Sequence, residues 1–222
     1  ILQEEKFRQT IEQGFQFIEE NDSLLTLGMK PTRPETGYGY IQRGEEAKGE
    51  EAKGEDIYKV KAFTEKPNLE LAKVFLESGD FLWNSGIFLW SIDSILSAFN
   101  EFLPEMANKF AEGDNVMGTP DEDAFIQQMF PTCPSISIDY GVMEKANNVY
   151  VINGDFGWSD VGTWGSAYQH LRKDRYANAL GNDHIFTYNT RNTIITSRPE
   201  KVTVVNGLKD YIVVDTPDVL LI

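Results

Sequence analysis

Apolar and polar residues follow two different patterns along this chain, and the change falls near residue 178. Before it, short strand-like runs are separated by stretches whose apolar residues recur every three or four positions, as in amphipathic helices. After it, only short β-rich runs remain, with turn residues between them. We therefore predict an α/β part, residues 1–178, followed by a β-rich segment, residues 179–222, made of stacked β-coils or a small all-β appendage.

The helices of the first part are predicted from apolar faces and capping residues. A helix over Gln3–Glu20 carries Phe7, Ile11, Phe15 and Ile18 on one face, and a short strand, Leu24–Gly28, follows it. Thr119–Glu122 has the sequence of a capping box with proline at the first helical position. Ser91 has the position of an N-cap, and its helix carries an apolar face of Ile92, Ile95, Leu96 and Phe99.

The central stretch of the pattern, Tyr58–Trp90, has the length and order of a strand–helix–strand unit. Tyr58–Thr64 alternates like a strand, and Pro67 ends it because proline has no N–H to donate. Asn68 caps a helix that Gly79 closes. The chain then returns through a turn at residues 84–86 to an apolar strand, residues 87–90.

Three polar side chains are expected to meet beside this unit, because ligands of open parallel sheets bind at the carboxyl ends of strands. They are the carboxylate of Glu65, the ammonium of Lys66 and the amide of Asn84. A carboxylate accepts from sugar hydroxyls, a lysine neutralises a phosphate, and an amide both donates and accepts. The set suits a phosphorylated sugar. From the pattern alone, a surface Glu-Lys pair beside a turn is the more economical explanation.

Two further segments carry candidate site residues. In Gly37-Tyr38-Gly39 the glycines let a ligand approach the backbone, and the Gly39 amide could bind a ligand oxygen; an ordinary glycine-containing loop is the alternative. Asp160 is expected at the end of a short aromatic strand, where a helix begins. An aspartate there is usually an N-cap, but it could instead bind Mg²⁺ together with phosphate oxygens and water.

Composition excludes several classes of protein. A formal net charge of −15 at pH 7 argues against nucleic acid and anionic membrane as partners, because both need a basic surface. The single cysteine, Cys133, excludes an intramolecular disulfide and fits a reducing cytoplasm, and two histidines without cysteine partners argue against zinc. No run approaches the roughly 18 apolar residues that span a bilayer. We therefore expect a cytoplasmic protein.

The acidity is partly local, in residues 44–56, where Gly-Glu-Glu-Ala-Lys occurs twice. Such a segment has almost nothing to bury, which predicts a solvated, mobile loop or an extended hairpin tip inserted between two strands. The sequence offers no functional explanation for it.

Five segments, taken together and in order, resemble the mannose-1-phosphate guanylyltransferases, a family of sugar-phosphate nucleotidyltransferases. Each segment is weak alone, but five in the family's order and spacing are a specific signal that covers essentially the whole chain. The segments are Gly37–Ile41, Phe63–Pro67, Trp83–Phe88, Ser137–Lys145 and Phe156–Trp164.

The resemblance implies a partial Rossmann-like, mixed sheet of the nucleotide-diphospho-sugar transferase type with flanking helices, followed by a short left-handed β-helix segment. It also implies that mannose-1-phosphate attacks the α-phosphorus of GTP, giving GDP-mannose and pyrophosphate. Lys66 would neutralise the sugar phosphate, Asp160 would hold Mg²⁺, and both would be catalytic. The implied substrate-binding residues are Tyr38, Gly39, Glu65, Lys66, Asn84, Ser85 and Gly86.

The chain departs from the family at its start. The family opens with a glycine-rich basic signature for the nucleotide, and a later Asp-His pair supplies another metal carboxylate; neither occurs here. We therefore expect residues 1–178 to be the sugar-phosphate half of a longer enzyme that does not turn over alone, and pyrophosphate release by this chain would contradict that. The apolar end, Val219–Ile222, is expected to pair with further sequence or with a second copy in a homodimer.

Two other functions stay open. The same reaction could use another hexose-1-phosphate or another nucleotide, because the missing half mainly reads the base. A non-catalytic regulatory or binding subunit is the other alternative, although such a subunit has no need of the metal carboxylate at Asp160.

Overall fold

The computed structural model describes residues 1–47 and 56–222. Residues 48–55, which hold most of the predicted acidic loop, lie outside the described part. The chain divides into two compact units, Ile1–Trp158 and Ser159–Ile222, and each is described here by itself. This division by internal contacts does not test the functional division predicted at residue 178, which stays a prediction.

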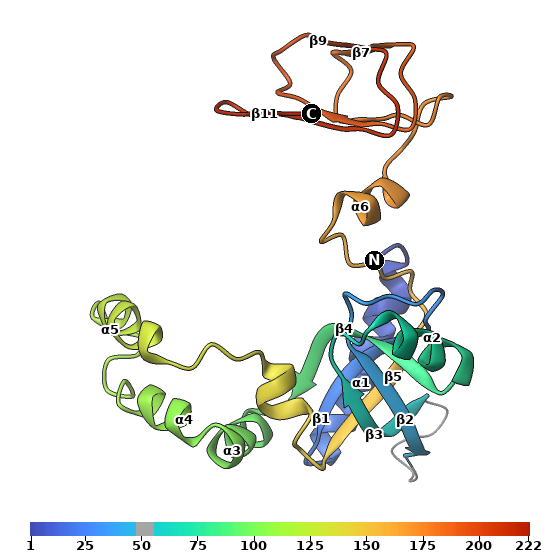
Figure 1. Cartoon of the computed structure of the whole chain (residues 1–222). Helices are drawn as coiled ribbons and strands as arrows, with labels where there is room; N and C mark the ends of the chain where they lie inside the picture. The colour runs from blue at the N-terminus through green and yellow to red at the C-terminus, as the bar shows by residue number, and fades with distance from the viewer. Residues whose placement is uncertain (48–55) are drawn as a thin grey trace. The chain divides into compact units, whose positions relative to one another are not determined.

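The first unit is built on five strands that close on themselves in the order β1-β4-β2-β3-β5 (Figure 1). Strands β1 and β5 run parallel, whereas the other neighbouring pairs are antiparallel. The sheet is therefore mixed, as predicted. The strands are β1 (Leu24–Met29), β2 (Tyr40–Glu46), β3 (Ile57–Thr64), β4 (Phe81–Trp90) and β5 (Val149–Gly154).

Two details of the central strand–helix–strand unit differ from the prediction. Strands β3 and β4 run in the same direction, but β2 lies between them and pairs antiparallel with both, so the unit is not part of an open parallel sheet. Residues 84–86 do not form a turn either, because β4 continues through them from Phe81 to Trp90. The strand keeps its pairing with β1 across an irregularity between Thr26 and Gly28.

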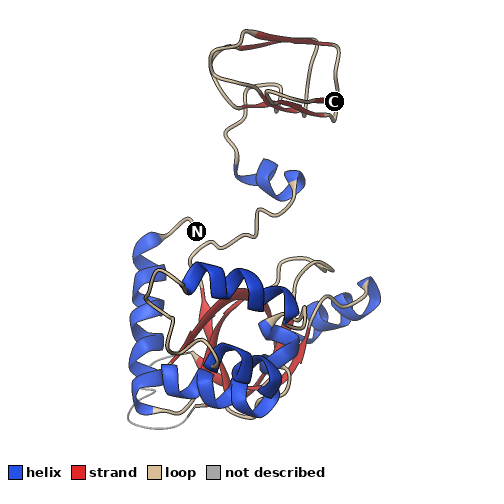
Figure 2. Ribbon diagram, turned by 90° about the vertical axis from the view of Figure 1, so that its left-hand side faces the viewer, coloured by secondary structure: helices blue, strands red, loops and turns tan. Residues whose placement is uncertain are grey.

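Helix α1 (Glu4–Glu20) packs against β1, β4 and β5, along one side of the sheet in Figure 2. A Cβ at Gly14 would overlap Leu89 of β4, so the absence of a side chain at this position lets the helix lie close against the sheet. The buried face therefore includes Phe17 and Ile18. The prediction for Phe15 is wrong, because this orientation leaves the ring 48% exposed.

Two predicted capping residues are confirmed. The Asn68 side chain accepts a hydrogen bond from the Leu71 amide at 2.9 Å and opens helix α2 (Leu69–Ser78), which Gly79 closes at φ 77°. Ser91 Oγ accepts from the Ser94 amide at 3.0 Å and opens helix α3 (Ile92–Phe102).

Two other expectations about helices are wrong. Ile92 and Leu96 of α3 are exposed, because the helix buries the side containing Ser94 and Ala98. Helix α5 (Glu122–Met129) begins only at the last residue of the predicted capping box, because Thr119 Oγ1 accepts from the Asp121 amide in a turn instead of capping the helix. Helix α4 (Pro104–Ala111) and a 3₁₀ turn, Phe130–Thr132, complete this region.

The second unit holds helix α6 (Trp164–His170) and the short β-runs that the sequence predicted. Strands β6, β8 and β10 pair parallel, as do β7 and β9, and β11 adds antiparallel to β10. Their apolar core is formed by Ile185, Ile195, Val205 and Val213. The strands are β6 (Ala179–Leu180), β7 (Ile185–Tyr188), β8 (Ile194–Thr196), β9 (Thr203–Asn206), β10 (Ile212–Asp215) and β11 (Leu220–Leu221).

None of the helices in the described ranges combines the length and the apolar character that crossing a bilayer requires.

Candidate functional site

The register of β2 brings the predicted substrate-binding residues of the first unit together. Tyr40, the first residue of β2, lies opposite Thr64 of β3 on one side and opposite Trp83 of β4 on the other. Because both pairings are antiparallel, the next residues outward, Gly39, Glu65 and Asn84, meet beyond the end of β2. The backbone N–H of Asn84 donates to the Gly39 carbonyl at 2.8 Å, and the backbone N–H of Lys66 donates to the Tyr38 carbonyl at 3.2 Å.

Gly39 leaves the space that the Glu65 carboxylate occupies. A Cβ at position 39 would overlap Glu65 Oε2 and lie 3.2 Å from Asn84 Cβ. The backbone at Gly39 does not have a positive φ, so the glycine is required by this close approach and not by its conformation. The sequence predicted that a group approaches the backbone at Gly39, and the Glu65 carboxylate makes this close approach.

The Glu65 carboxylate is buried and only half satisfied. Its side chain is 10% exposed, and Oε1 accepts a hydrogen bond from Lys66 Nζ at 2.8 Å. Oε2 is buried and has no hydrogen-bond partner among the described residues. An unpaired buried acceptor costs free energy, of the order of 1–3 kcal/mol, so a ligand donor that reaches Oε2 would gain a strong hydrogen bond.

Lys66 lies beside this carboxylate with its side chain 61% exposed. The hydrogen bond to the Glu65 carboxylate is the main cause that raises the pKa of Lys66, so the side chain remains a cation at neutral pH. Its backbone has φ 49°, a left-handed conformation that non-glycine residues seldom adopt. Such strain is concentrated at functional sites, where the surrounding structure holds the residue in place.

The Asn84 side chain is held by hydrogen bonds from three directions. Its Oδ1 accepts from Thr26 Oγ1 at 3.1 Å and from the Gly86 amide at 3.2 Å, and its Nδ2 donates to Asp139 Oδ1 at 2.9 Å. Thr26 is completely buried in β1. The amide is therefore fixed in both position and orientation.

Asp139 opens a single π-helical turn, Asp139–Met143, in which the Glu144 amide donates to the Asp139 carbonyl at 2.9 Å. Short π-helical turns occur frequently at functional sites. Desolvation is the main cause that raises the pKa of Glu144, and repulsion by Glu65 and Asp139 raises it further. The candidate site thus combines three interacting carboxylates, those of Glu65, Asp139 and Glu144, with the ammonium of Lys66.

Aromatic rings line the other side of Gly39. The Tyr38 ring makes edge-to-face contacts with Trp83 and Trp158, with centroids 5.3 and 5.4 Å apart. Arg33 lies over the Trp83 ring at 5.3 Å and pairs with Glu35 at 3.0 Å. Such rings offer apolar faces suited to a sugar or a base.

Ser85 and Gly86 shape the backbone beside Asn84. Ser85 Oγ accepts from the Ile87 amide at 3.2 Å, and Gly86 has φ 72°. This left-handed glycine aims its amide back at Asn84 Oδ1.

Asp160 lies in the second unit and is not the helix cap that its position suggested. Thr163 caps α6 instead, in a reciprocal capping box with Ser166. The Asp160 carboxylate accepts from the Gly162 amide at 3.0 Å, which gives a compact turn before the helix. The short aromatic strand expected before Asp160 is also wrong, because residues 155–159 are irregular. Among the described residues, no three His, Cys, Asp or Glu side chains gather closely enough to hold a metal ion.

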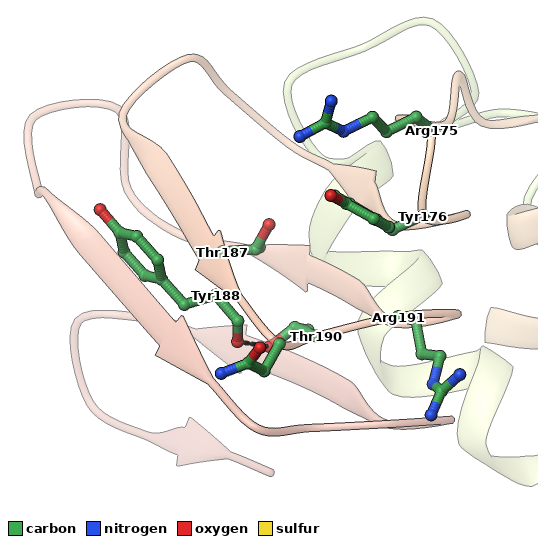
Figure 3. Close-up of a pocket in the computed structure, with 7 residues that line it drawn as sticks. Arg175, Tyr176, Thr187, Tyr188, Thr190 and Arg191 are labelled. Carbon is green, nitrogen blue, oxygen red and sulfur yellow. Dashed lines mark hydrogen bonds between the residues drawn. The ribbon is translucent and has the colours of Figure 1, made fainter.

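A cavity of about 540 Å³ in the second unit is unrelated to the predicted site (Figure 3). Arg175 lies over the Tyr176 ring on one side of this cavity, and Tyr188 borders the other side. None of the predicted site residues lines it. The lining residues are Arg175, Tyr176, Thr187, Tyr188, Asn189, Thr190 and Arg191.

Sequence reasoning missed Thr26 and Glu144 as members of the site and included Asp139 only as part of the family segment Ser137–Lys145. Thr26 carried a usable signal, since it is the one hydroxyl residue in the apolar strand Leu24–Met29. A buried polar residue in such a strand needs a partner. Nothing in the local sequence indicates that the partner is Asn84.

Comparison with known proteins gives an independent indication of the family. The model of the family described as "Nucleotidyl transferase" matches residues 1–177. A mannose-1-phosphate guanylyltransferase from Salmonella montevideo is 39% identical over 228 residues, covering 100% of this chain and 46% of that protein. One from Escherichia coli is 36% identical over 220 residues, covering 97% and 46%. This chain spans about half the length of these curated relatives.

Solved structures agree. The crystal structure of a "mannose-1-phosphate geranyltransferase" from Thermus thermophilus matches with a TM-score of 0.75 and 28% identity, over 100% of this chain and 61% of that chain. A mannose-6-phosphate isomerase from Helicobacter pylori, 22% identical with a TM-score of 0.58 over 72% of this chain and 60% of that one, shares the fold. The resemblance carried by the five sequence segments is confirmed, and the chain belongs to the nucleotidyl transferase family.

Proposed function

We propose that this chain carries the sugar-phosphate site of an enzyme that makes GDP-mannose from mannose-1-phosphate and GTP. In this reaction a phosphate oxygen of the sugar phosphate forms a bond to the α-phosphorus of GTP. The bond from that phosphorus to the bridging oxygen breaks, and the oxygen leaves with pyrophosphate. Positioning and charge neutralisation supply most of the catalysis in transfers of this kind.

The observation that carries the proposal is the unpaired Oε2 of Glu65 beside Gly39. A buried carboxylate oxygen without a partner is suited to accept from a ligand hydroxyl, and sugars supply several neighbouring hydroxyls. Lys66 is bound to the other oxygen of the same carboxylate. Glu65 thus offers an acceptor for a ligand hydroxyl, and Lys66 beside it offers a cation for a phosphate. Together they fit a sugar that carries a phosphate.

The remaining predicted residues have supporting roles in this proposal. Asn84 would hold a sugar hydroxyl with its amide, and Ser85 and Gly86 would set the backbone that positions it. Tyr38, held edge-on between two tryptophans, would present an apolar wall to the sugar or ribose.

We assign Mg²⁺ to Asp160 in the complete enzyme. Mg²⁺ is bound by one or two carboxylates together with phosphate oxygens and water, so a single exposed aspartate in a tight turn fits this role. When bound, the ion would neutralise charge on the phosphates of GTP.

The β-rich segment, residues 179–222, is proposed to be part of a left-handed β-helix. Its short strands pair in parallel with the next strand but one, β6 with β8, β8 with β10 and β7 with β9, around one apolar core, which supports this assignment.

The test is calorimetric titration of the chain with mannose-1-phosphate, with and without Mg²⁺. We expect saturable binding that is tighter than binding of free mannose. Lys66→Ala should abolish the preference for the phosphorylated sugar, since the ammonium would no longer face the phosphate. The matched control is Lys73→Ala, which removes the same charge from an exposed position of α2 and should bind like the parent chain.

Two results would count against the proposal. Equal binding of mannose and mannose-1-phosphate would mean that no phosphate site exists here. Tighter binding of a different hexose-1-phosphate would keep the chemistry and change the sugar. Each titration needs a thermal unfolding curve of the same sample, which shows that the chain is folded.

A further inference from the structure

The hydrogen-bonding capacity of Asn84 is almost completely used inside the protein. Oδ1 accepts from the Gly86 amide and from the Thr26 hydroxyl, whose one hydrogen is shared with the Ile87 carbonyl at 3.3 Å. Of the two Nδ2 hydrogens, one is donated to Asp139. One hydrogen therefore remains, so Asn84 can offer a ligand a donor but no acceptor.

The orientation of this amide follows from its partners. If the amide were turned over, Oδ1 would face the Asp139 carboxylate, and two acceptors would repel each other. Nδ2 would then face the Gly86 amide, and two donors would meet without an acceptor. Asp139 and Gly86 thus both enforce the same orientation, and Thr26 completes it from the buried strand β1.

Glu65, in contrast to Asn84, can offer a ligand an acceptor but no donor. Its Oε2 is an acceptor only, and Oε2 and the Asn84 side chain flank the same point, the place that a Cβ at Gly39 would take. A hydroxyl is the group that can donate to one neighbour and accept from the other.

We propose that Thr26 and Asp139 are positioning residues that hold Asn84 as a pure donor. Asn84 and Glu65 together select a ligand hydroxyl that donates to Glu65 Oε2 and accepts from Asn84 Nδ2. This inference rests on the proposed sugar-phosphate function of the same pocket. It adds Thr26 and Asp139 as the residues that fix Asn84 as a donor, and a hydroxyl as the group that is recognised.

The combination of one acceptor on Glu65 and one donor on Asn84 predicts how analogues of the sugar bind. Replacing the selected hydroxyl by hydrogen removes both interactions. Replacing it by fluorine leaves a weak acceptor but places it against a carboxylate, so the fluoro analogue should bind as poorly as the deoxy analogue. Sites that bury hydrogen-bonding groups discriminate strongly against ligands that lack the matching group.

The experiment is calorimetric titration of the chain with mannose-1-phosphate and with its deoxy and deoxyfluoro analogues at each ring position. The variants are Asp139→Ala, Asp139→Asn and Thr26→Val. Asp139→Ala should weaken mannose-1-phosphate binding by roughly tenfold, the size of one lost hydrogen bond. Asp139→Asn should restore most of it, because an amide oxygen can accept from the same Nδ2.

Thr26→Val tests the other side of the amide and keeps the shape of a buried β-branched residue. It should weaken binding by less than tenfold, since Gly86 still holds the oxygen. In the Thr26→Val/Asp139→Ala double variant only the Gly86 amide still favours one orientation of the Asn84 amide, so the preference for the parent sugar over its fluoro analogue should shrink. A residue that only stabilised the fold would lower affinity for all analogues equally.

Three outcomes would overturn the inference. The first is that Asp139→Ala binds like the parent chain. The second is that Asp139→Asn is as weak as Asp139→Ala, which would show that the charge matters and the acceptor does not. The third is that the fluoro analogue binds like mannose-1-phosphate. If the parent chain binds no mannose-1-phosphate while folded, the proposed function itself fails, and this inference fails with it. If Asp139→Ala does not fold, Asp139→Asn and Thr26→Val decide alone.

Discussion

At the scale of single residues, the candidate site depends on a missing side chain. Gly39 is the position where β2, β3 and β4 come together, and the Glu65 carboxylate fills the place of its Cβ. The sequence indicated that a glycine here leaves room for something. Only the structure shows that this is the protein's own carboxylate.

Gly39→Ala is therefore expected to disable the site. The added methyl would displace Glu65 Oε2, and mannose-1-phosphate affinity should fall by about tenfold or more, measured by calorimetry. The matched control is Gly37→Ala, where the nearest atom, Glu35 Oε1, lies at an ordinary 3.5 Å. Equal affinities for both variants would contradict the importance of the close approach at Gly39.

Glu144 should make the free energy of unfolding depend on pH. Desolvation and the neighbouring carboxylates raise its pKa above 4.5, the ordinary value, so the folded chain holds this proton more tightly than the unfolded chain. The free energy of unfolding should therefore fall as pH rises from 4.5 through the raised pKa. Glu144→Gln should remove this part of the fall. Denaturation midpoints measured across this range would show parallel curves for both proteins if the idea is wrong.

At the scale of elements, capping was predictable where one residue dominates a helix end and misleading where two compete. Asn68 stands alone before α2 and caps it. Before α6, both Asp160 and Thr163 are suitable residues. Thr163 caps the helix because its hydroxyl and that of Ser166 satisfy each other's amides, while Asp160 accepts from Gly162 in the preceding turn.

Asn68→Ala should destabilise the first unit by about 1 kcal/mol, the usual loss when an N-cap is replaced by alanine. The unsatisfied group would be the Leu71 amide, to which the Asn68 side chain is bound. Chemical denaturation followed by circular dichroism measures the change. Asn147→Ala, a position outside the helices, is the control and should lie within about 0.5 kcal/mol of the parent chain.

At the scale of the whole molecule, the net charge of −15 acts on every charged ligand. This charge should repel an anionic sugar phosphate as it approaches, although Lys66 would attract it at the proposed site. Raising the ionic strength from about 10 mM to about 150 mM shortens the screening length from about 30 Å to about 8 Å and should speed association.

Stopped-flow measurements of mannose-1-phosphate binding would test this. An uncharged methyl mannoside is the control, and its association rate should not change with salt. A rate that falls with salt for the phosphate would mean that the local field of Lys66 outweighs the charge of the molecule.

The sequence by itself determined many of the elements of this protein and named most residues of its candidate site. Helix α1, the caps at Asn68 and Ser91, the β-runs after residue 178 and the family segments could all be predicted, because they depend on neighbours a few positions apart. The tertiary structure decided how β2 separates β3 from β4 and that β4 runs through residues 84–86. It also decided that Thr26 and Asp139 hold Asn84. These partners are 58 and 55 residues from Asn84 in the chain. No local pattern records such contacts, because they exist only once the strands have paired.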